Sequence, residues 1–122
     1  MKKRILVVDD EKEVCDVIAA ILDKTGRFET KKENSSIKVI EAAEEFKPDL
    51  ITMDLMMPEV DGASLASQIR ENQQLKNIPI IYITGLITKA EESTHACDEL
   101  EDYIAKPLDA KELIDKINAL IS

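Results

Sequence analysis

Ile5-Leu6-Val7-Val8 is a continuous apolar run, and residues 11–24 follow it with apolar residues at helical spacing. A short run of this kind predicts a strand that is buried on both faces, as in parallel sheets. Residues at positions i, i+3, i+4, i+7 and i+8 lie on one face of a helix. In the second segment these positions are Val14, Val17, Ile18, Ile21 and Leu22. The start of the chain therefore predicts a buried strand followed by an amphipathic helix.

The same alternation continues to the end of the chain. The sequence predicts further strands at 28–31, 50–53, 80–83 and 103–105. It predicts further helices from Ser35 or Ser36 to Phe46, at 62–71, at 89–97, and after Asp109. Gly26 and Pro48 stand where the first two helices should stop. Five β-α units in succession predict an α/β fold, a doubly wound parallel sheet of five strands with helices on both faces.

Length and composition narrow the class of protein. The 122 residues, 44% hydrophobic and 34% charged, are expected to form one domain spanning residues 1–122. A net charge of −9 argues against direct binding to nucleic acid. No apolar run is long enough for a membrane span or a signal peptide, so we expect a cytoplasmic protein. Cys15 and Cys97 form no metal-binding or redox motif.

Polar, reactive residues follow four of the predicted strands. In open parallel sheets, ligands bind outside the carboxyl ends of the strands, where the strand order reverses. The residues at these ends are Asp9 and Asp10, Asp54, Thr84 and Lys106. Each of them alone would be a turn residue, a helix cap, a strand residue or a surface charge. Their joint occurrence at the strand ends predicts a functional site.

Three carboxylates at one edge of a sheet repel one another unless a cation lies between them. Mg²⁺ prefers oxygen ligands, and Asp9, Asp10 and Asp54 would supply them. An aspartate carboxylate can act as a nucleophile toward phosphorus. Phosphoryl transfer depends mainly on positioning and charge stabilisation, which the Lys106 ammonium and the Thr84 hydroxyl can provide. The site therefore predicts a phosphoryl group on Asp54.

The chain resembles the receiver domain of bacterial two-component response regulators along essentially its whole length. Three segments carry the resemblance: Ile5-Leu-Val-Val-Asp-Asp-Glu11, Leu50-Ile-Thr-Met-Asp-Leu-Met-Met-Pro-Glu-Val-Asp-Gly62 and Asp102-Tyr-Ile-Ala-Lys-Pro107. The spacings from Asp10 to Asp54, Thr84 and Lys106 also match the family. The resemblance implies a flavodoxin-like fold with strand order 2-1-3-4-5.

The resemblance also implies a role for each site residue. Asp54 is expected to be the phosphoacceptor, and Lys106 and Thr84 are expected to contact the phosphoryl group. Asp10, Asp54, Asp9 and the backbone carbonyl of Met56 are expected to hold Mg²⁺. Thr84 and Tyr103 are expected to form the switch that moves on phosphorylation. The bond between Lys106 and Pro107 is expected to be cis.

The resemblance further implies partners. The phosphodonor is expected to be the phosphohistidine of a sensor histidine kinase or phosphotransfer protein, since the chain has no nucleotide-binding motif. Candidate docking residues are Val14, Cys15, Ile18, Pro107 and Leu108, although some of these must instead belong to the core. The surface formed by the predicted helix at 89–97, the last strand and the last helix is the candidate output face toward a downstream protein. The chain is expected to be a monomer or a phosphorylation-dependent homodimer.

Three other functions stay open on the sequence. A flavodoxin-like cofactor carrier would share the fold, but the acidic residues after the first strand would repel a phosphate group. A binding module could keep the fold and ignore phosphorylation. A phosphatase with an aspartate nucleophile would turn over external substrates, but the position two residues after Asp54 is Met56 instead of an acid.

Overall fold

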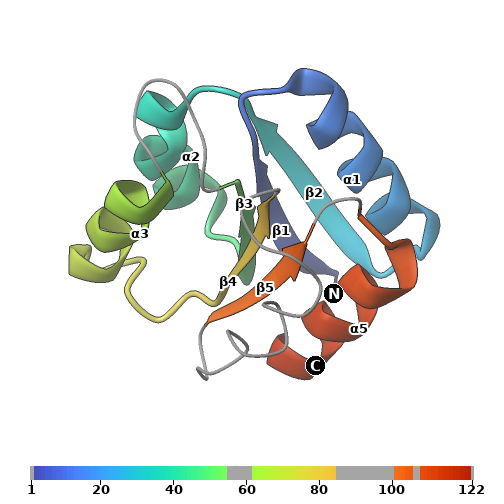
Figure 1. The fold of residues 1–122 in the computed structure, drawn as a ribbon. Coiled ribbons are helices and arrows are strands. Elements are labelled where there is room, and N and C mark those ends of the chain that lie inside the picture. Colours follow the sequence, from blue (N-terminus) through green and yellow to red (C-terminus); the bar gives the residue numbers. More distant parts are fainter. Residues whose placement is uncertain (1, 55–61, 85–100, 106–107, 122) are drawn as a thin grey trace.

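The structure, a computed structural model, describes residues 2–54, 62–84, 101–105 and 108–121. Its sheet has five parallel strands in the order β2-β1-β3-β4-β5 (Figure 1). The strands are β1 (Lys3–Val8), β2 (Phe28–Glu33), β3 (Leu50–Met53), β4 (Ile80–Thr84) and β5 (Glu101–Ala105). The predicted fold class and strand order are confirmed.

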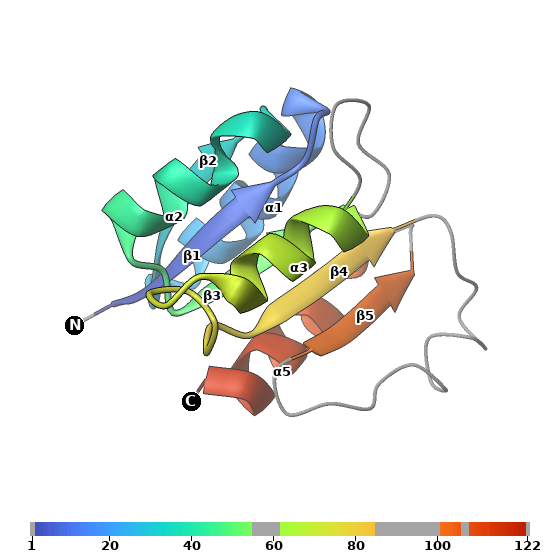
Figure 2. The same ribbon diagram turned by 90° about the vertical axis from the view of Figure 1, so that its left-hand side faces the viewer.

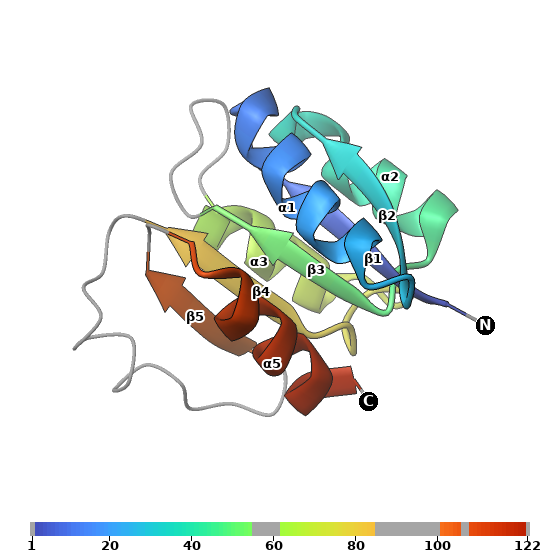
Figure 3. The ribbon, with the colours of Figure 1, turned by 90° about the vertical axis from the view of Figure 1, so that its right-hand side faces the viewer.

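Helices cover both faces of the sheet. They are α1 (Lys12–Lys24), α2 (Val39–Phe46), α3 (Gly62–Glu71) and α5 (Ala110–Ile121), with a short 3₁₀ helix, η1 (Ser36–Lys38), before α2. Figure 2 shows α2 and α3 on one face, and Figure 3 shows α1 and α5 on the other. The predicted helix at 89–97 lies outside the described residues. None of the helices in the described part of the chain has the length and apolar character needed to cross a membrane.

Two apolar cores lie on either side of the sheet. Side chains alternate between the faces of a strand, so Ile5 and Val7 of β1 pack toward α1 and α5. Leu6 and Val8 pack toward α2 and α3. All four side chains are at most 2% exposed. The prediction of a first strand buried on both faces is confirmed.

The buried face of α1 differs from the predicted stripe at one residue. Val17 is 55% exposed, while Cys15, Ile18, Ala19 and Leu22 are buried. Cys15 precedes Leu22 by two helical turns, whereas Val17 lies about 200° around the helix from Cys15. The prediction of Val17 as a core residue was wrong because the small residues Cys15 and Ala19 take the central positions.

The start of α2 also differs from the prediction. Ser35 occupies the N-cap position of η1 but makes no side-chain capping hydrogen bond, and α2 itself begins only at Val39. Ser36 is buried, and its hydroxyl has no hydrogen-bond partner among the residues that the structure describes. The predicted serine cap was therefore wrong, although a helix ending at Phe46 was correct.

The predicted stops of α1 and α2 are confirmed. Gly26 has a φ of +69°, the left-handed conformation that commonly follows a helix. Lys47 adopts a φ of +54° after α2 and its N–H donates to the Ala43 carbonyl oxygen, directly before Pro48. Both turns send the chain back along the sheet into the next strand.

Candidate acidic site at the carboxyl ends of the strands

The register of the two central strands brings Asp9 and Asp54 together. Val8, the last residue of β1, pairs with Met53, the last residue of β3. The N–H of Asp54 donates to the Val8 carbonyl oxygen at 3.3 Å, which extends the ladder by one residue. On the other side of β1, the N–H of Asp9 donates to the carbonyl oxygen of Glu33 in β2, also at 3.3 Å. Both aspartates therefore begin their loops at the same level of the sheet edge.

Three carboxylates converge at this edge. One oxygen from each of Asp9, Asp10 and Asp54 lies within 4.8 Å of the others. Asp9 is 1% exposed and Asp54 is 6% exposed, whereas Asp10 is exposed. The cluster therefore has two buried carboxylates and one that faces solvent.

The backbone around Asp9 is held by several hydrogen bonds. Asp9 Oδ1 accepts from the Glu11 N–H at 2.9 Å, which is the turn-stabilising role that an aspartate in this place can have. The Asp9 carbonyl oxygen accepts from Asn34 Nδ2 at 3.2 Å. The Cys15 thiol lies 3.5 Å from the same oxygen. Asp9 is thus both a turn residue and a member of the acidic cluster.

Cys15 lies beneath this loop in the core. Burial, reinforced by the negative charge of Asp9, raises the pKa of the Cys15 thiol from 9.0 to about 11. The thiol is therefore protonated at neutral pH and serves as a packing residue with weak hydrogen bonds to the Asp9 and Val7 carbonyl oxygens. Cys15 adds no ligand to the site.

The acidic cluster fits a hard divalent cation. The donors that the described residues supply are carboxylate oxygens, the type that Mg²⁺ prefers, and one of the three carboxylates, Asp10, is exposed. Within the part of the chain that the structure describes, no histidine or thiolate contributes to the cluster, so softer metals have less reason to bind. Chemically, such a site can screen negative charge next to a buried aspartate.

The structure describes only some of the other predicted site residues. Thr84 is the last residue of β4 and pairs with Ala105, the last residue of β5. Lys106 follows Ala105 in the chain but lies outside the described residues, as do Met56 and Pro107. The topology therefore brings Thr84 and the backbone leading into Lys106 to the same edge of the sheet as Asp54.

Tyr103 has a neighbour that the sequence did not predict. It is partly buried on β5 and stacks on Tyr82 of β4, with ring centroids 5.0 Å apart and planes at 30°. Tyr82 is 3% exposed and lies in the core on the side of α2 and α3. The two residues are direct partners in the ladder between β4 and β5. An aromatic residue two positions before Thr84 was the available sequence signal.

Comparisons with known proteins agree with this geometry. The model of the response regulator receiver domain matches residues 5–118. The chain belongs to the response regulator receiver domain family. Receiver domains of this family work in two-component phosphorelay signalling, where they are switches that interact with histidine kinases and downstream effectors.

Individual relatives are similar over almost the whole chain. The polar-differentiation response regulator DivK of Brucella ovis is 28% identical, with 99% of this chain and 98% of DivK covered. The transcriptional regulator RpaA of Synechocystis is 30% identical over 97% of this chain, which spans about half, 48%, of RpaA. The receiver domain of the sensor histidine kinase PA1611 from Pseudomonas aeruginosa has a TM-score of 0.80 and 30% identity, with 97% and 96% of the two chains covered. That structure has a magnesium ion coordinated in its active-site cleft.

Proposed function

We propose that Asp54 accepts a phosphoryl group from the phosphohistidine of a histidine kinase or phosphotransfer protein. The observation that carries this proposal is the position of the Asp54 carboxylate, 6% exposed and within 4.8 Å of two other carboxylates at the edge of the sheet. Three carboxylates this close repel one another, and a bound divalent cation would relieve that repulsion. We further propose that residues 1–122 form one receiver domain that works in the cytoplasm.

Asp10, Asp54 and Asp9 would hold Mg²⁺, with the Met56 carbonyl oxygen as a further ligand. When bound, the ion would neutralise the negative charge that develops on the phosphoryl oxygens. The magnesium ion in the receiver domain of PA1611 supports this assignment. Asp54 would supply the attacking carboxylate oxygen, Asp9 would hold the loop in place through Glu11, and Lys106 and Thr84 would contact the transferred group.

Attack by an Asp54 oxygen forms an acyl phosphate while the bond from phosphorus to the donor's imidazole nitrogen breaks. The product carries roughly −1.5 to −2 charges in place of one. We propose that Thr84 then moves toward the phosphoryl group and that Tyr103 turns inward. This movement would shift an existing equilibrium of the surface that includes β5 and α5.

Burial separates the candidate docking residues for the phosphodonor into core and surface residues. Cys15 and Ile18 are 0% and 2% exposed, so they belong to the core and cannot contact a partner. Val14 and Leu108 are partly buried, and Pro107 lies outside the described residues. Val17 is exposed on α1. We propose a docking surface centred on α1 with Val14, Val17 and Leu108.

The phosphoacceptor is tested by incubating the chain with acetyl phosphate and Mg²⁺ and measuring intact mass. We expect one phosphoryl adduct that needs Mg²⁺, is removed by hydroxylamine as an acyl phosphate, and is absent in Asp54→Asn. Asp115→Asn, an exposed carboxylate on α5, is the matched control and should keep the adduct. An unchanged mass would favour a binding module that ignores phosphorylation, and repeated hydrolysis of unrelated phosphate esters would favour a phosphatase.

A further inference from the structure

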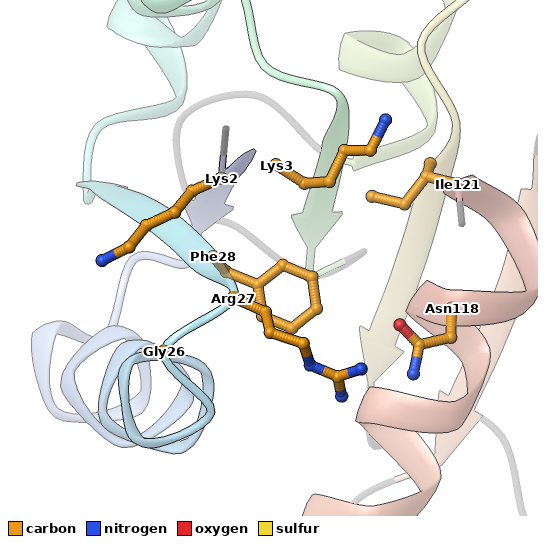
Figure 4. Close-up of a pocket in the computed structure, with 7 residues that line it drawn as sticks. All are labelled: Lys2, Lys3, Gly26, Arg27, Phe28, Asn118 and Ile121. Atoms are coloured by element: carbon orange, nitrogen blue, oxygen red, sulfur yellow. The ribbon is translucent and has the colours of Figure 1, made fainter.

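A pocket lies at the opposite end of the sheet from the acidic cluster. It has a volume of about 470 Å³ and is lined by Lys2, Lys3, Gly26, Arg27, Phe28, Asn118 and Ile121. These residues come from the start of β1, the turn into β2 and the end of α5 (Figure 4). A strand as long as β1 spans about 20 Å, so the pocket and the acidic site are separate. Its volume is in the range of pockets that hold small molecules.

The charge of this pocket is opposite to that of the protein. The chain has 25 acidic and 16 basic residues, yet among the residues that the structure describes the lining contains three cations and no carboxylate side chain. Several other basic side chains are paired: Arg4 with Glu29, Lys32 with Asp16, Lys111 with Asp115 and Lys116 with Asp102. Lys2, Lys3 and Arg27 form no ion pair with any residue that the structure describes. An anion would therefore meet attraction without displacing an internal partner.

The frame of the pocket is fixed by backbone contacts. The Lys3 N–H donates to the Arg27 carbonyl oxygen at 3.3 Å, and Lys3 pairs with Phe28 in the sheet. The Arg27 N–H donates to Thr25 Oγ1 at 3.1 Å. These contacts hold the turn at Gly26 against β1 and fix the direction in which Arg27 leaves the chain.

The lining also offers an apolar wall and a polar side chain. Phe28 is 4% exposed and anchored in the core shared with α5. The Arg27 guanidinium carbon lies 5.9 Å from the centre of its ring. In Figure 4 the Arg27 guanidinium and the Asn118 amide lie below and to the lower right of the Phe28 ring, and Ile121 lies to its upper right. A guanidinium binds carboxylates through two parallel hydrogen bonds, and an apolar body would lie along Phe28 and Ile121.

We propose that this pocket binds a small organic anion, one carboxylate on a flat apolar body, with Arg27 as its main anchor. Lys2 and Lys3 add positive potential from flexible side chains at the rim. The pocket shares no residue with the acidic cluster, so this proposal does not rest on phosphorylation of Asp54.

The test uses phenylacetate as the probe and follows amide shifts by NMR in the full chain, without Mg²⁺, at physiological salt. A ligand of this size should bind with a Kd on the order of 1 mM. Shifts should concentrate at residues 26–28 and at Asn118. The neutral analogue phenylacetamide should bind at least about tenfold more weakly, because it lacks the charge that Arg27 recognises.

Arg27→Gln and Lys31→Gln form the matched pair of variants. Both remove one exposed cation from the β2 region, but Lys31 does not line the pocket. Arg27→Gln should weaken phenylacetate binding about tenfold, and Lys31→Gln by less than about twofold because salt screens its charge. Absence of shifts at residues 26–28, equal losses in both variants, or equal binding of phenylacetamide would each overturn the proposal.

Discussion

Thr52 lies in the central strand β3 with a fully buried side chain. Its hydroxyl has no hydrogen-bond partner in the described structure, and its ladder partners are the core residues Val7 and Ile81. A buried, unpaired hydroxyl is costly, while valine has the same shape without the polar group. We predict that Thr52→Val raises the free energy of unfolding by about 1 kcal/mol, measured by urea denaturation.

Thr30→Val is the control for this substitution. Thr30 also lies in a strand, but its hydroxyl donates to Asp23 at 3.0 Å. Loss of that hydrogen bond should leave stability unchanged or lower it. A Thr52→Val protein that is less stable than the wild type would show that the hydroxyl has a partner in solution.

At the scale of elements, the Asp16–Lys32 ion pair ties α1 to β2, with Nζ and Oδ1 2.9 Å apart. The hydrogen bond from Lys32 lowers the pKa of Asp16 below 3.8, and the Asp16 carboxylate raises the pKa of Lys32 above 10.5. A lowered acid pKa stabilises the fold above pH 3.8, and this contribution is lost as the pH falls through the folded pKa. The raised lysine pKa stabilises the fold below pH 10.5, and this contribution is lost as the pH rises through the folded pKa.

We therefore predict that Asp16→Asn is less stable than the wild type at neutral pH and equally stable in strong acid. The neutral-pH difference should be small and should shrink in high salt, because both side chains are about half exposed. Urea denaturation across pH measures both effects. A difference that is the same at neutral and acid pH would mean that the pair does not act through charge.

The stacked rings of Tyr82 and Tyr103 link β4 and β5 beside the proposed switch. Stacked rings contribute roughly 0.5–1.5 kcal/mol beyond their burial. We predict a coupling energy in that range from a double-mutant cycle of Tyr82→Leu and Tyr103→Leu. Tyr82→Phe should keep most of the coupling, because the stacking depends on the ring. A coupling near zero would mean that the two rings pack independently.

The same pair supplies its own spectroscopic probe. Tyr82 and Tyr103 are the only tyrosines of the chain, which has no tryptophan. The near-ultraviolet circular dichroism of tyrosine therefore reports on these two rings alone. If Tyr103 moves on phosphorylation as proposed, this signal should change with acetyl phosphate and Mg²⁺ in the wild type but not in Asp54→Asn.

At the scale of the whole molecule, the α/β fold class and the edge that carries the acidic site could be predicted from periodicity, whereas the strand order followed from the resemblance to receiver domains. Apolar runs such as Ile5 to Val8 identify buried strands, and parallel strands place residues 9 and 54 at the same edge. The stacking of Tyr82 on Tyr103 could not be predicted, because it depends on the register between strands and on the rotamers of both rings. The basic pocket could not be predicted for a similar reason, because its lining comes from three segments that are distant in sequence.

Charge repulsion within the acidic cluster should affect the stability of the whole fold. Asp10 is the exposed member of the acidic cluster, with a carboxylate oxygen within 4.8 Å of one from each of two buried carboxylates. Like charges at such a separation repel by about 1 kcal/mol even in water. Without a divalent cation, we predict that Asp10→Asn is more stable than the wild type by about this amount. With Mg²⁺ the order should reverse, because binding to the folded state stabilises it by about 2.7 kcal/mol when free Mg²⁺ is roughly 100 times Kd.

Thermal unfolding with and without Mg²⁺ measures both parts of this prediction. Glu45→Gln, which removes an exposed carboxylate from α2, is the control and should respond to Mg²⁺ like the wild type. A magnesium effect of equal size in Asp10→Asn would remove Asp10 from the metal site. Reversal of the stability order requires the same carboxylate to destabilise the metal-free fold and to bind the ion, so a single variant tests the electrostatic basis of the site without any phosphorylation.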